Sequence, residues 1–289
     1  MGTTVSNLAY VEPGAELGED VFIGPFCFVG KNVRIGDNTR LDSHVSIAGH
    51  TTIGCSNRFF AGSVIGAEPQ DVSYRSNAPT SVEIGDHNIF REGVTVNRGA
   101  EKEDHCTRIG NHNMLMSNSH VAHNCRVYNN VILVNGVLLG GHVHVQDWAI
   151  VSGNSAVHHF ATVGTMAFVG GQSRVTVDAP PYMMSAGNEK LTVHTINIIG
   201  LRRRGLSEST IRALKQAHRL IYREHLSLDK AVDTLHERLE GVIPIEVSNL
   251  IHFLEKQREG RSGRAREAFR NQDPAKMNSQ ESANIRRAA

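Results

Sequence analysis

The sequence of 289 residues lacks several features that mark common classes of protein. Its four cysteines are far apart and form no CxxC pair, so neither a disulfide framework nor a zinc knuckle is indicated. The formal net charge is only +1, which gives no reason to expect nucleic acid as a partner. The N-terminus has no basic stretch followed by an apolar core, and no apolar run approaches the roughly 18 residues of a membrane span. We therefore predict a cytoplasmic protein that does not insert into membranes.

What the sequence does contain is a repeat of six residues. An aliphatic or aromatic residue recurs at every sixth position over residues 5–65, 84–96 and 109–175, and glycine often follows it. Such a unit is a short strand with a corner, and three units close one triangular coil of eighteen residues. We therefore predict a mainly β protein, a left-handed parallel β-helix over residues 1–180. An antiparallel sandwich is the alternative, but its strands would vary in length and lose the six-residue phase.

Two breaks in the repeat, near 67–82 and 99–108, are predicted to be loops extruded from the prism. Loops on a rigid scaffold often carry function.

Helical periodicity replaces the repeat over residues 181–256, where we predict a small C-terminal helical domain. Ser207 and Ser227 are suited to cap the first two helices, and Pro244 to open a third. From residue 257 to residue 289 the chain is rich in Arg, Ser, Gln and Asn and has few apolar residues, which predicts a disordered tail.

Histidines, of which there are sixteen, gather where the repeat stacks the chain. Residues eighteen apart lie one coil above each other, so His123 lies below Gly141, and His120, His142 and His158 or His159 fall within about 10 Å. An imidazole with a pKa near 6.5 is a natural general base. One histidine could deprotonate a hydroxyl while the Gly141 N–H stabilises an oxyanion. Alternatively, three histidines could bind zinc, as in the gamma-class carbonic anhydrases that share this prism.

Several short motifs extend this pattern: HVAHNC at 120–125, GGHV at 140–143, SAVHHF at 155–160, GNEK at 187–190, NIIGLRRRG at 197–205, IGPF at 23–26 and PQD at 69–71. With them the chain resembles the UDP-N-acetylglucosamine O-acyltransferases that begin lipid A synthesis, up to about residue 256. The resemblance implies transfer of an (R)-3-hydroxyacyl chain from acyl carrier protein to the 3-hydroxyl of UDP-N-acetylglucosamine. It further implies a homotrimer with sites between subunits, and no cofactor or metal.

The resemblance also assigns roles to individual residues. His123 matches the general base, Gly141 the oxyanion donor, Asn124 the residue that supports the base, and Gly171 the floor of an acyl tunnel. Asn197, Arg203 and Arg204 match residues that reach the nucleotide from a neighbouring subunit, where guanidinium groups suit a diphosphate. The remaining substrate-binding matches are Gln70, Asp71, His120, His142 and His158.

Three positions depart from the family pattern. Asn124 stands where the family has aspartate, Ser73 where it has a lysine, and Ile199 where we expect an acidic residue. An amide can accept a hydrogen bond from the imidazole but supplies no negative charge. These departures leave two other interpretations open: a weakened paralogue that binds a nucleotide sugar or carrier protein without turnover, and a zinc-dependent carbonic anhydrase relative.

Overall fold

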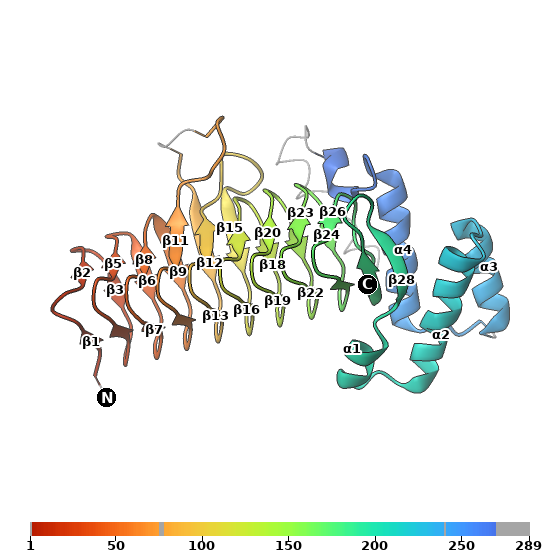
Figure 1. Ribbon diagram of the computed structural model, residues 1–289, viewed down its shortest axis with the longest axis horizontal. Helices are drawn as coiled ribbons and strands as arrows, with labels where there is room; N and C mark the ends of the chain where they lie inside the picture. The colour runs from red at the N-terminus through yellow and green to blue at the C-terminus, as the bar shows by residue number, and fades with distance from the viewer. Residues whose placement is uncertain (1, 75–77, 240, 270–289) are drawn as a thin grey trace.

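The residues at every sixth position point into the interior of a three-sided prism (Figure 1). The computed structural model describes residues 2–74, 78–239 and 241–269. Ile23, Leu41, Phe59, Leu115 and Val151 are each completely buried along the prism axis. The left-handed parallel β-helix predicted from the repeat is thus confirmed.

Three parallel sheets form the sides of the prism, and the chain visits sheets A, B and C in turn. Most neighbouring strands pair residues that are eighteen apart, as in His120↔Leu138 and Arg126↔His144. Sheet A contains β1 (Thr4–Val5), β4 (Phe22–Ile23), β7 (Arg40–Leu41), β10 (Arg58–Phe59), β13 (Ile89–Phe90), β16 (Met114–Leu115), β19 (Ile132–Leu133), β22 (Ile150–Val151), β25 (Phe168–Val169), β27 (Met183–Ala186) and β28 (Thr192–Ile196).

Sheets B and C have the same construction. Sheet B contains β2 (Tyr10–Val11), β5 (Phe28–Val29), β8 (Ser46–Ile47), β11 (Val64–Ala67), β14 (Thr95–Asn97), β17 (His120–Val121), β20 (Leu138–Leu139), β23 (Ala156–Val157) and β26 (Arg174–Val175). Sheet C contains β3 (Glu16–Leu17), β6 (Val33–Ile35), β9 (His50–Ile53), β12 (Ser81–Ile84), β15 (Cys106–Ile109), β18 (Arg126–Val127), β21 (His144–Val145) and β24 (Thr162–Val163).

The corners between sheets form three edges, which we name by the sheets they join: A–B, B–C and C–A. Both breaks in the repeat leave the prism at the B–C edge, where residues 68–80 connect β11 to β12 and residues 98–105 connect β14 to β15 (Figure 1). Arg98 pins the first loop, because its guanidinium donates to Glu68 at 2.9 Å and to the Tyr74 hydroxyl at 3.2 Å. Because both loops leave at one edge, the strands before and after each loop still pair in register with the neighbouring coils.

Sheet A continues past the boundary predicted at residue 180. β27 adds a parallel strand beside β25, and β28 then returns antiparallel to β27. The two strands close the end of sheet A and lead the chain into the helices.

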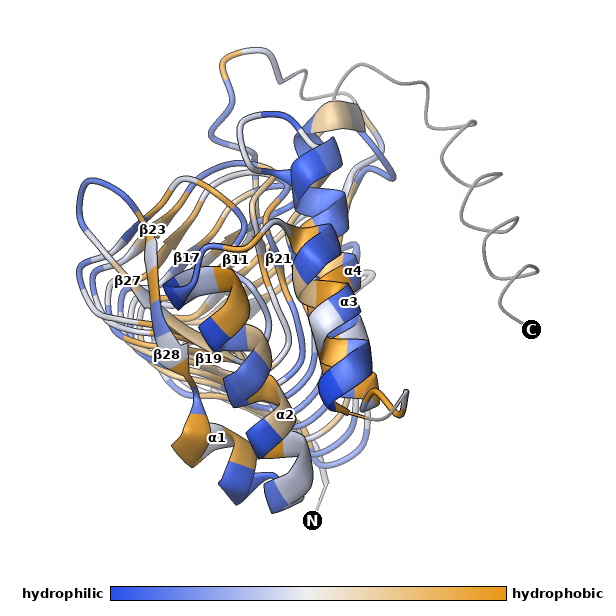
Figure 2. Ribbon diagram, turned by 90° about the vertical axis from the view of Figure 1, so that its right-hand side faces the viewer, coloured by the Kyte–Doolittle hydropathy of each residue, from blue (hydrophilic) through white to orange (hydrophobic). Residues whose placement is uncertain are grey.

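The helical domain packs on this end of the prism: α1 (Ile198–Arg203), α2 (Glu208–His218), a π turn at Arg219–Arg223, α3 (Leu228–Arg238) and α4 (Ile245–Glu259). Ser207 caps α2 by accepting from the Thr210 N–H at 3.1 Å, and Ser227 caps α3 through the Lys230 N–H at 3.4 Å, as predicted. Apolar and polar stripes alternate along the helices (Figure 2), and the apolar side chains bury a second core. Among the described residues, no helix has the length and apolarity to cross a bilayer.

The predicted start of the disordered tail, residue 257, is too early in the sequence. α4 runs to Glu259, and residues 260–269, which we call the C-terminal strap, fold back onto the prism and include a 3-10 turn at Ala265–Phe269. Composition alone suggested disorder because the strap is polar, but polar groups of the last coil bind it. Residues 270–289, the rest of the predicted tail, lie outside the described residues.

Candidate active site

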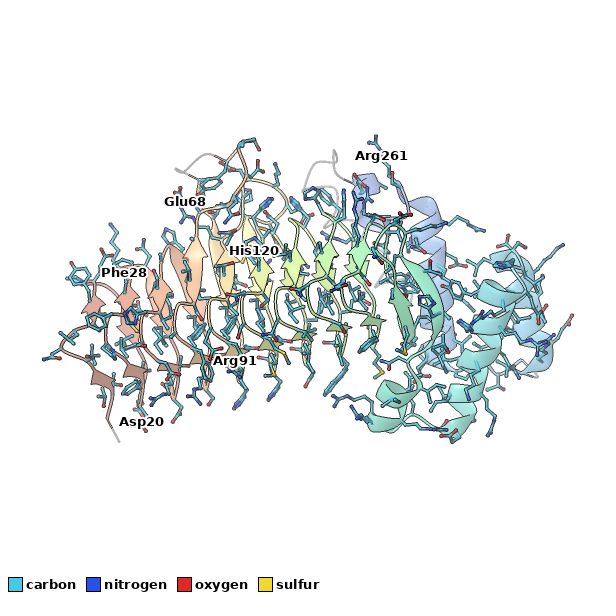
Figure 3. The ribbon with its side chains drawn as sticks, viewed as in Figure 1. Asp20, Phe28, Glu68, Arg91, His120 and Arg261 are labelled. Carbon is cyan, nitrogen blue, oxygen red and sulfur yellow. The ribbon has the colours of Figure 1, made fainter. Side chains whose placement is uncertain are left out.

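The B–C edge of the middle coils gathers the predicted histidines beneath the two extruded loops. His120 lies on β17, His123 at the next corner, and His142 and His158 at the corners one and two coils further. Figure 3 shows His120 on the upper side of the prism together with Glu68 of the first loop, while Asp20 and Arg91 lie on the lower side. The stacking inferred from spacing is therefore present in the fold.

His123 is held in the tautomer that a general base requires. Its Nδ1 lies 2.9 Å from the Asn124 side-chain oxygen. The amide of Asn124 cannot be reversed, because its oxygen accepts from the Ala100 N–H at 2.9 Å and its nitrogen donates to the Lys102 carbonyl at 2.7 Å. Nδ1 must therefore carry the proton, which leaves the lone pair on Nε2. Burial lowers the pKa of His123 below its ordinary value, so the ring is neutral near pH 7.

Gly141 lies directly against this ring. A Cβ at residue 141 would be 2.7 Å from both Cε1 and Nε2 of His123. Within the described part of the chain, no hydrogen bond has the Gly141 N–H as its donor. A free backbone donor next to the lone pair of a base is the arrangement that stabilises an oxyanion formed beside it.

Asp71 reaches the same place from the first loop. Its Oδ2 is 3.9 Å from His123 Nε2 and 2.8 Å from Lys102 Nζ, and its Oδ1 accepts from the backbone and hydroxyl of Ser73. The hydrogen bond from Lys102, followed by those from Ser73, holds the pKa of Asp71 far below its usual range. Gln70 lies exposed beside it.

Lys102 is a residue that sequence reasoning missed. The family resemblance led us to expect a lysine at position 73, and the second loop instead brings the Lys102 ammonium to within 3.2 Å of the Ser73 hydroxyl. Residues 73 and 102 are far apart in sequence, and only the fold of two adjacent loops joins them. Their presence in two predicted functional loops was the only signal available.

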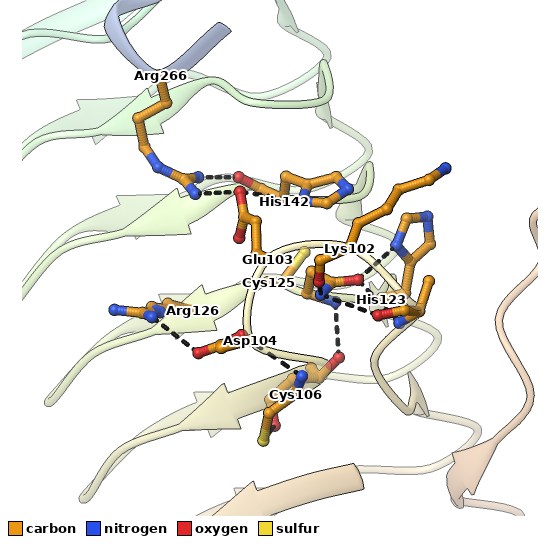
Figure 4. A network of polar contacts seen from close by, with 12 residues as sticks. Lys102, Glu103, Asp104, Cys106, His123, Cys125, Arg126, His142 and Arg266 are labelled. Carbon is orange, nitrogen blue, oxygen red and sulfur yellow. Dashed lines mark hydrogen bonds and ion pairs between the residues drawn. The ribbon is translucent and has the colours of Figure 1, made fainter. Parts of the chain in front are cut away.

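His142 is the most enclosed of the clustered histidines. Its ring stacks on Phe160 at a centroid distance of 4.3 Å and meets His123 edge-on at 5.1 Å. Its Nδ1 is 3.2 Å from a Glu103 carboxylate oxygen, which also pairs with Arg266 of the C-terminal strap (Figure 4). Neither Glu103 nor Arg266 was predicted from the sequence.

The outer histidines flank this pair. His120 Nδ1 lies 2.7 Å from the Thr95 hydroxyl, and burial, followed by the nearby His123, lowers the pKa of His120. His158 Nδ1 contacts the His159 carbonyl at 3.0 Å.

The remaining predicted residues lie away from the B–C edge. Asn197 caps α1 through the Gly200 N–H and donates to the Met166 carbonyl, so both ends of its amide are engaged within the chain. The Arg204 guanidinium stacks on Trp148 at the C–A edge, 3.4 Å from the ring centroid. Gly171 lies exposed at the A–B edge. Arg203 belongs to α1 with Asn197. Within one chain, these residues therefore do not lie beside His123.

The zinc alternative gains no support from the geometry. Within the ranges that the structure describes, no three His, Cys, Asp or Glu side chains are grouped as metal ligands would be.

A hexapeptide-repeat prism with a neutral histidine against a backbone N–H defines the class of left-handed β-helix acyltransferases. The acyl-[acyl-carrier-protein]–UDP-N-acetylglucosamine O-acyltransferase of Burkholderia orbicola is 44% identical over 260 residues, which cover 89% of this chain and 98% of that protein. The chain therefore belongs to the UDP-N-acetylglucosamine O-acyltransferase family.

Other similarities agree. A family model described as UDP-N-acetylglucosamine O-acyltransferase, domain 2, matches residues 178–262. The enzyme of the same name from Gloeothece citriformis is 49% identical over 185 residues, and the match spans 64% of this chain and 66% of that protein, just under two thirds of its length. The crystal structure of the UDP-N-acetylglucosamine acyltransferase of Bacteroides fragilis superposes with a TM-score of 0.82 at 38% identity, covering 87% of this chain and 97% of that one.

Proposed function

We propose that this chain transfers an (R)-3-hydroxyacyl group from acyl carrier protein to the 3-hydroxyl of UDP-N-acetylglucosamine, the first step of lipid A biosynthesis. The observation that carries the proposal is the His123 imidazole, neutral and protonated on Nδ1, lying against Gly141, whose N–H donates no hydrogen bond among the described residues.

The reaction follows from these two groups. His123 Nε2 takes the proton of the sugar hydroxyl as its oxygen attacks the thioester carbonyl carbon. The carbonyl oxygen gains the negative charge, and the Gly141 N–H stabilises it. The intermediate then expels the carrier thiolate, which takes the proton back from the His123 imidazolium. An ester forms, a thioester breaks, and the base is regenerated.

The neighbouring residues suit the sugar acceptor. Asp71 stays ionised and can accept a hydrogen bond from a sugar hydroxyl, Lys102 offers donors beside Asp71, and the His142 ring flanks His123. Gln70, His120 and His158 complete the predicted contacts on this edge.

The site is completed in a homotrimer by residues that one chain holds away from His123. Asn197, Arg203 and Arg204 reach the nucleotide from a neighbouring subunit, where the two guanidinium groups bind the diphosphate, and Gly171 leaves room for the acyl chain. Cytoplasmic localisation is part of the same proposal. Mixing an inactive His123→Ala variant with an inactive Arg204→Ala variant restores activity if sites are shared between subunits.

The departures from the family pattern do not favour a binder without turnover. Asn124 selects the same tautomer of the base that an aspartate would, and Lys102 supplies the ammonium that Ser73 lacks. The site therefore keeps its base, its oxyanion donor and the charged pair of Asp71 and Lys102 beside them.

The test is an acyl-transfer assay with hydroxyacyl carrier proteins and UDP-N-acetylglucosamine. We expect His123→Ala to lower kcat by about 10² to 10⁴ with an unchanged Tm, because a general base contributes that much. His87→Asn is the matched control, since His87 occupies a corner at the C–A edge and asparagine tolerates its φ of 58°. Equal rates for wild type and His123→Ala would remove His123 from the mechanism. No transfer by the wild-type protein would overturn the function.

A further inference from the structure

We infer that Arg266 is a positioning residue of the acyl-transfer site, acting through Glu103 on His142. The inference rests on the proposed function and adds to it a residue of the C-terminal strap, beyond the segment that the family model matches.

The strap is firmly docked on the last coil of the prism. The Ala265 N–H donates to Asp178 Oδ2 at 2.7 Å, and the Asp178 N–H donates to the Gly263 carbonyl at 2.8 Å. The side chain of Arg264 is only 9% exposed, pairs with Glu267 and donates to the Thr176 carbonyl. These contacts fix the backbone at residue 265, and Arg266 extends from it toward the B–C edge.

Arg266 bridges the strap to the site. Its guanidinium donates to a Glu103 carboxylate oxygen at 2.8 Å and to the backbone carbonyl of His142 (Figure 4). Glu103 and Arg266 have side chains that are 20% and 19% exposed. Burial alone would raise the pKa of Glu103, but His142 and Arg266 outweigh it and lower that pKa, so Glu103 is ionised. A largely buried carboxylate needs such a partner.

Ionised Glu103 sets the orientation of His142. The carboxylate oxygen that pairs with Arg266 is also 3.2 Å from His142 Nδ1, and its negative charge favours the proton on that nitrogen. Stacking on Phe160, with an interplanar angle of 6°, fixes the ring plane. With Glu103 beside Nδ1, Nε2 is the ring nitrogen without the proton.

Loss of the Arg266 side chain would remove two contacts, one to Glu103 and one to the His142 carbonyl. The second loop would keep its contacts with Asn124 but lose the only guanidinium on Glu103 among the described residues. The His142 carbonyl would lose its side-chain donor. His142 would then lie less well placed beside His123, although neither catalytic group has changed.

The experiment compares Arg266→Ala, Arg266→Lys, Glu103→Gln and the double variant Arg266→Ala/Glu103→Gln. We expect each single change to lower kcat by about tenfold to a hundredfold, as for other residues that orient a functional histidine. The double variant should be no worse than the poorer single variant, because both act on one histidine. Guanidinium ion in the buffer should restore part of the activity of Arg266→Ala. Arg261→Ala, on the same strap, is the control and should match wild type.

A second measurement does not depend on turnover. Nitrogen NMR of the His142 ring should show the proton on Nδ1 in wild type and a mixture of tautomers in Arg266→Ala and Glu103→Gln. Additive losses in the double variant, or an unchanged His142 spectrum in both single variants, would overturn the inference. If the wild-type protein transfers no acyl chain, the proposed function fails, and the His142 spectra still decide the coupling.

Discussion

Asparagines occupy corners at both the C–A edge and the B–C edge of the prism, but their side chains have different roles at the two edges. At the C–A edge the buried amides of Asn57, Asn88 and Asn113 form a ladder in which each oxygen accepts from the backbone of the next coil, at 2.7–2.9 Å. At the B–C edge, Asn124 also occupies a corner, with φ of 57°, but its amide faces the extruded loop and His123.

The difference shows where a repeat fold can acquire chemistry. A corner whose polar groups are all paired with the next coil stabilises the stack and has nothing left to offer a ligand. At the B–C edge, no hydrogen bond of the described residues is donated by the Gly141 N–H, and His120, His123 and His142 lie beside the extruded loops. The asparagine ladder of the C–A edge is structural, and the B–C edge carries the candidate active site.

The largest effect after loss of the base itself is expected from Gly141→Ala. The new Cβ would lie 2.7 Å from the His123 ring, which must move, and a displacement of about 1 Å can cost roughly 10² in rate. Because only a side chain yields, the Tm should change little. Gly30→Ala, at the same edge but 3.5 Å from its nearest neighbour, is the control. If Gly141→Ala keeps the wild-type kcat, the position of the His123 ring against Gly141 is not required for catalysis.

Asn88→Ala should instead interrupt the asparagine ladder at the C–A edge and lower the stability of the fold. It leaves the backbone N–H of Asn113 and the backbone carbonyl of Gly110 without their side-chain partners, and each buried unpaired group costs about 1–3 kcal/mol. We expect a lower midpoint in denaturant or thermal unfolding, with kcat unchanged in the folded protein. A loss of kcat at unchanged stability would contradict the division between the edges.

Asn124→Asp should change the pH dependence of activity. In the native chain kcat/KM falls as the pH drops through the lowered pKa of His123. A carboxylate on Nδ1–H stabilises the imidazolium, so the acidic limb should move to higher pH. The same carboxylate faces the Lys102 carbonyl, which loses its donor, and the loop should be destabilised by about 1–3 kcal/mol. A large gain in kcat with an intact loop would instead show that asparagine weakens the enzyme.

Lys102→Met should have the smallest effect. The ammonium is half exposed, and such an ion pair is worth up to about 1 kcal/mol, so we expect KM for UDP-N-acetylglucosamine to rise up to about fivefold. Lys102→Arg should recover most of the loss. An unchanged KM in Lys102→Met would remove Lys102 from the acceptor pocket.

Much of the site could be predicted because stacking converts sequence spacing into distance. His123, Gly141 and His142 belong to an unbroken run of the repeat, so their vertical order follows from counting. Lys102, Glu103 and Arg266 could not be found this way, because a loop and a strap lie outside the repeat and no period relates them to His123. Asn197 also caps a helix, a local bond that the motif did not reveal, and its contact with the nucleotide stays a prediction.

The sequence by itself determined the prism, its register and the edge on which the histidines stack, because a six-residue period leaves the backbone one way to bury its aliphatic side chains. Only the tertiary structure decided the tautomer of His123, the lysine beside Asp71 and the link from the C-terminal strap to His142. Those depend on side chains from segments far apart in the chain, whose approach is set by loop closure and packing rather than by any local pattern.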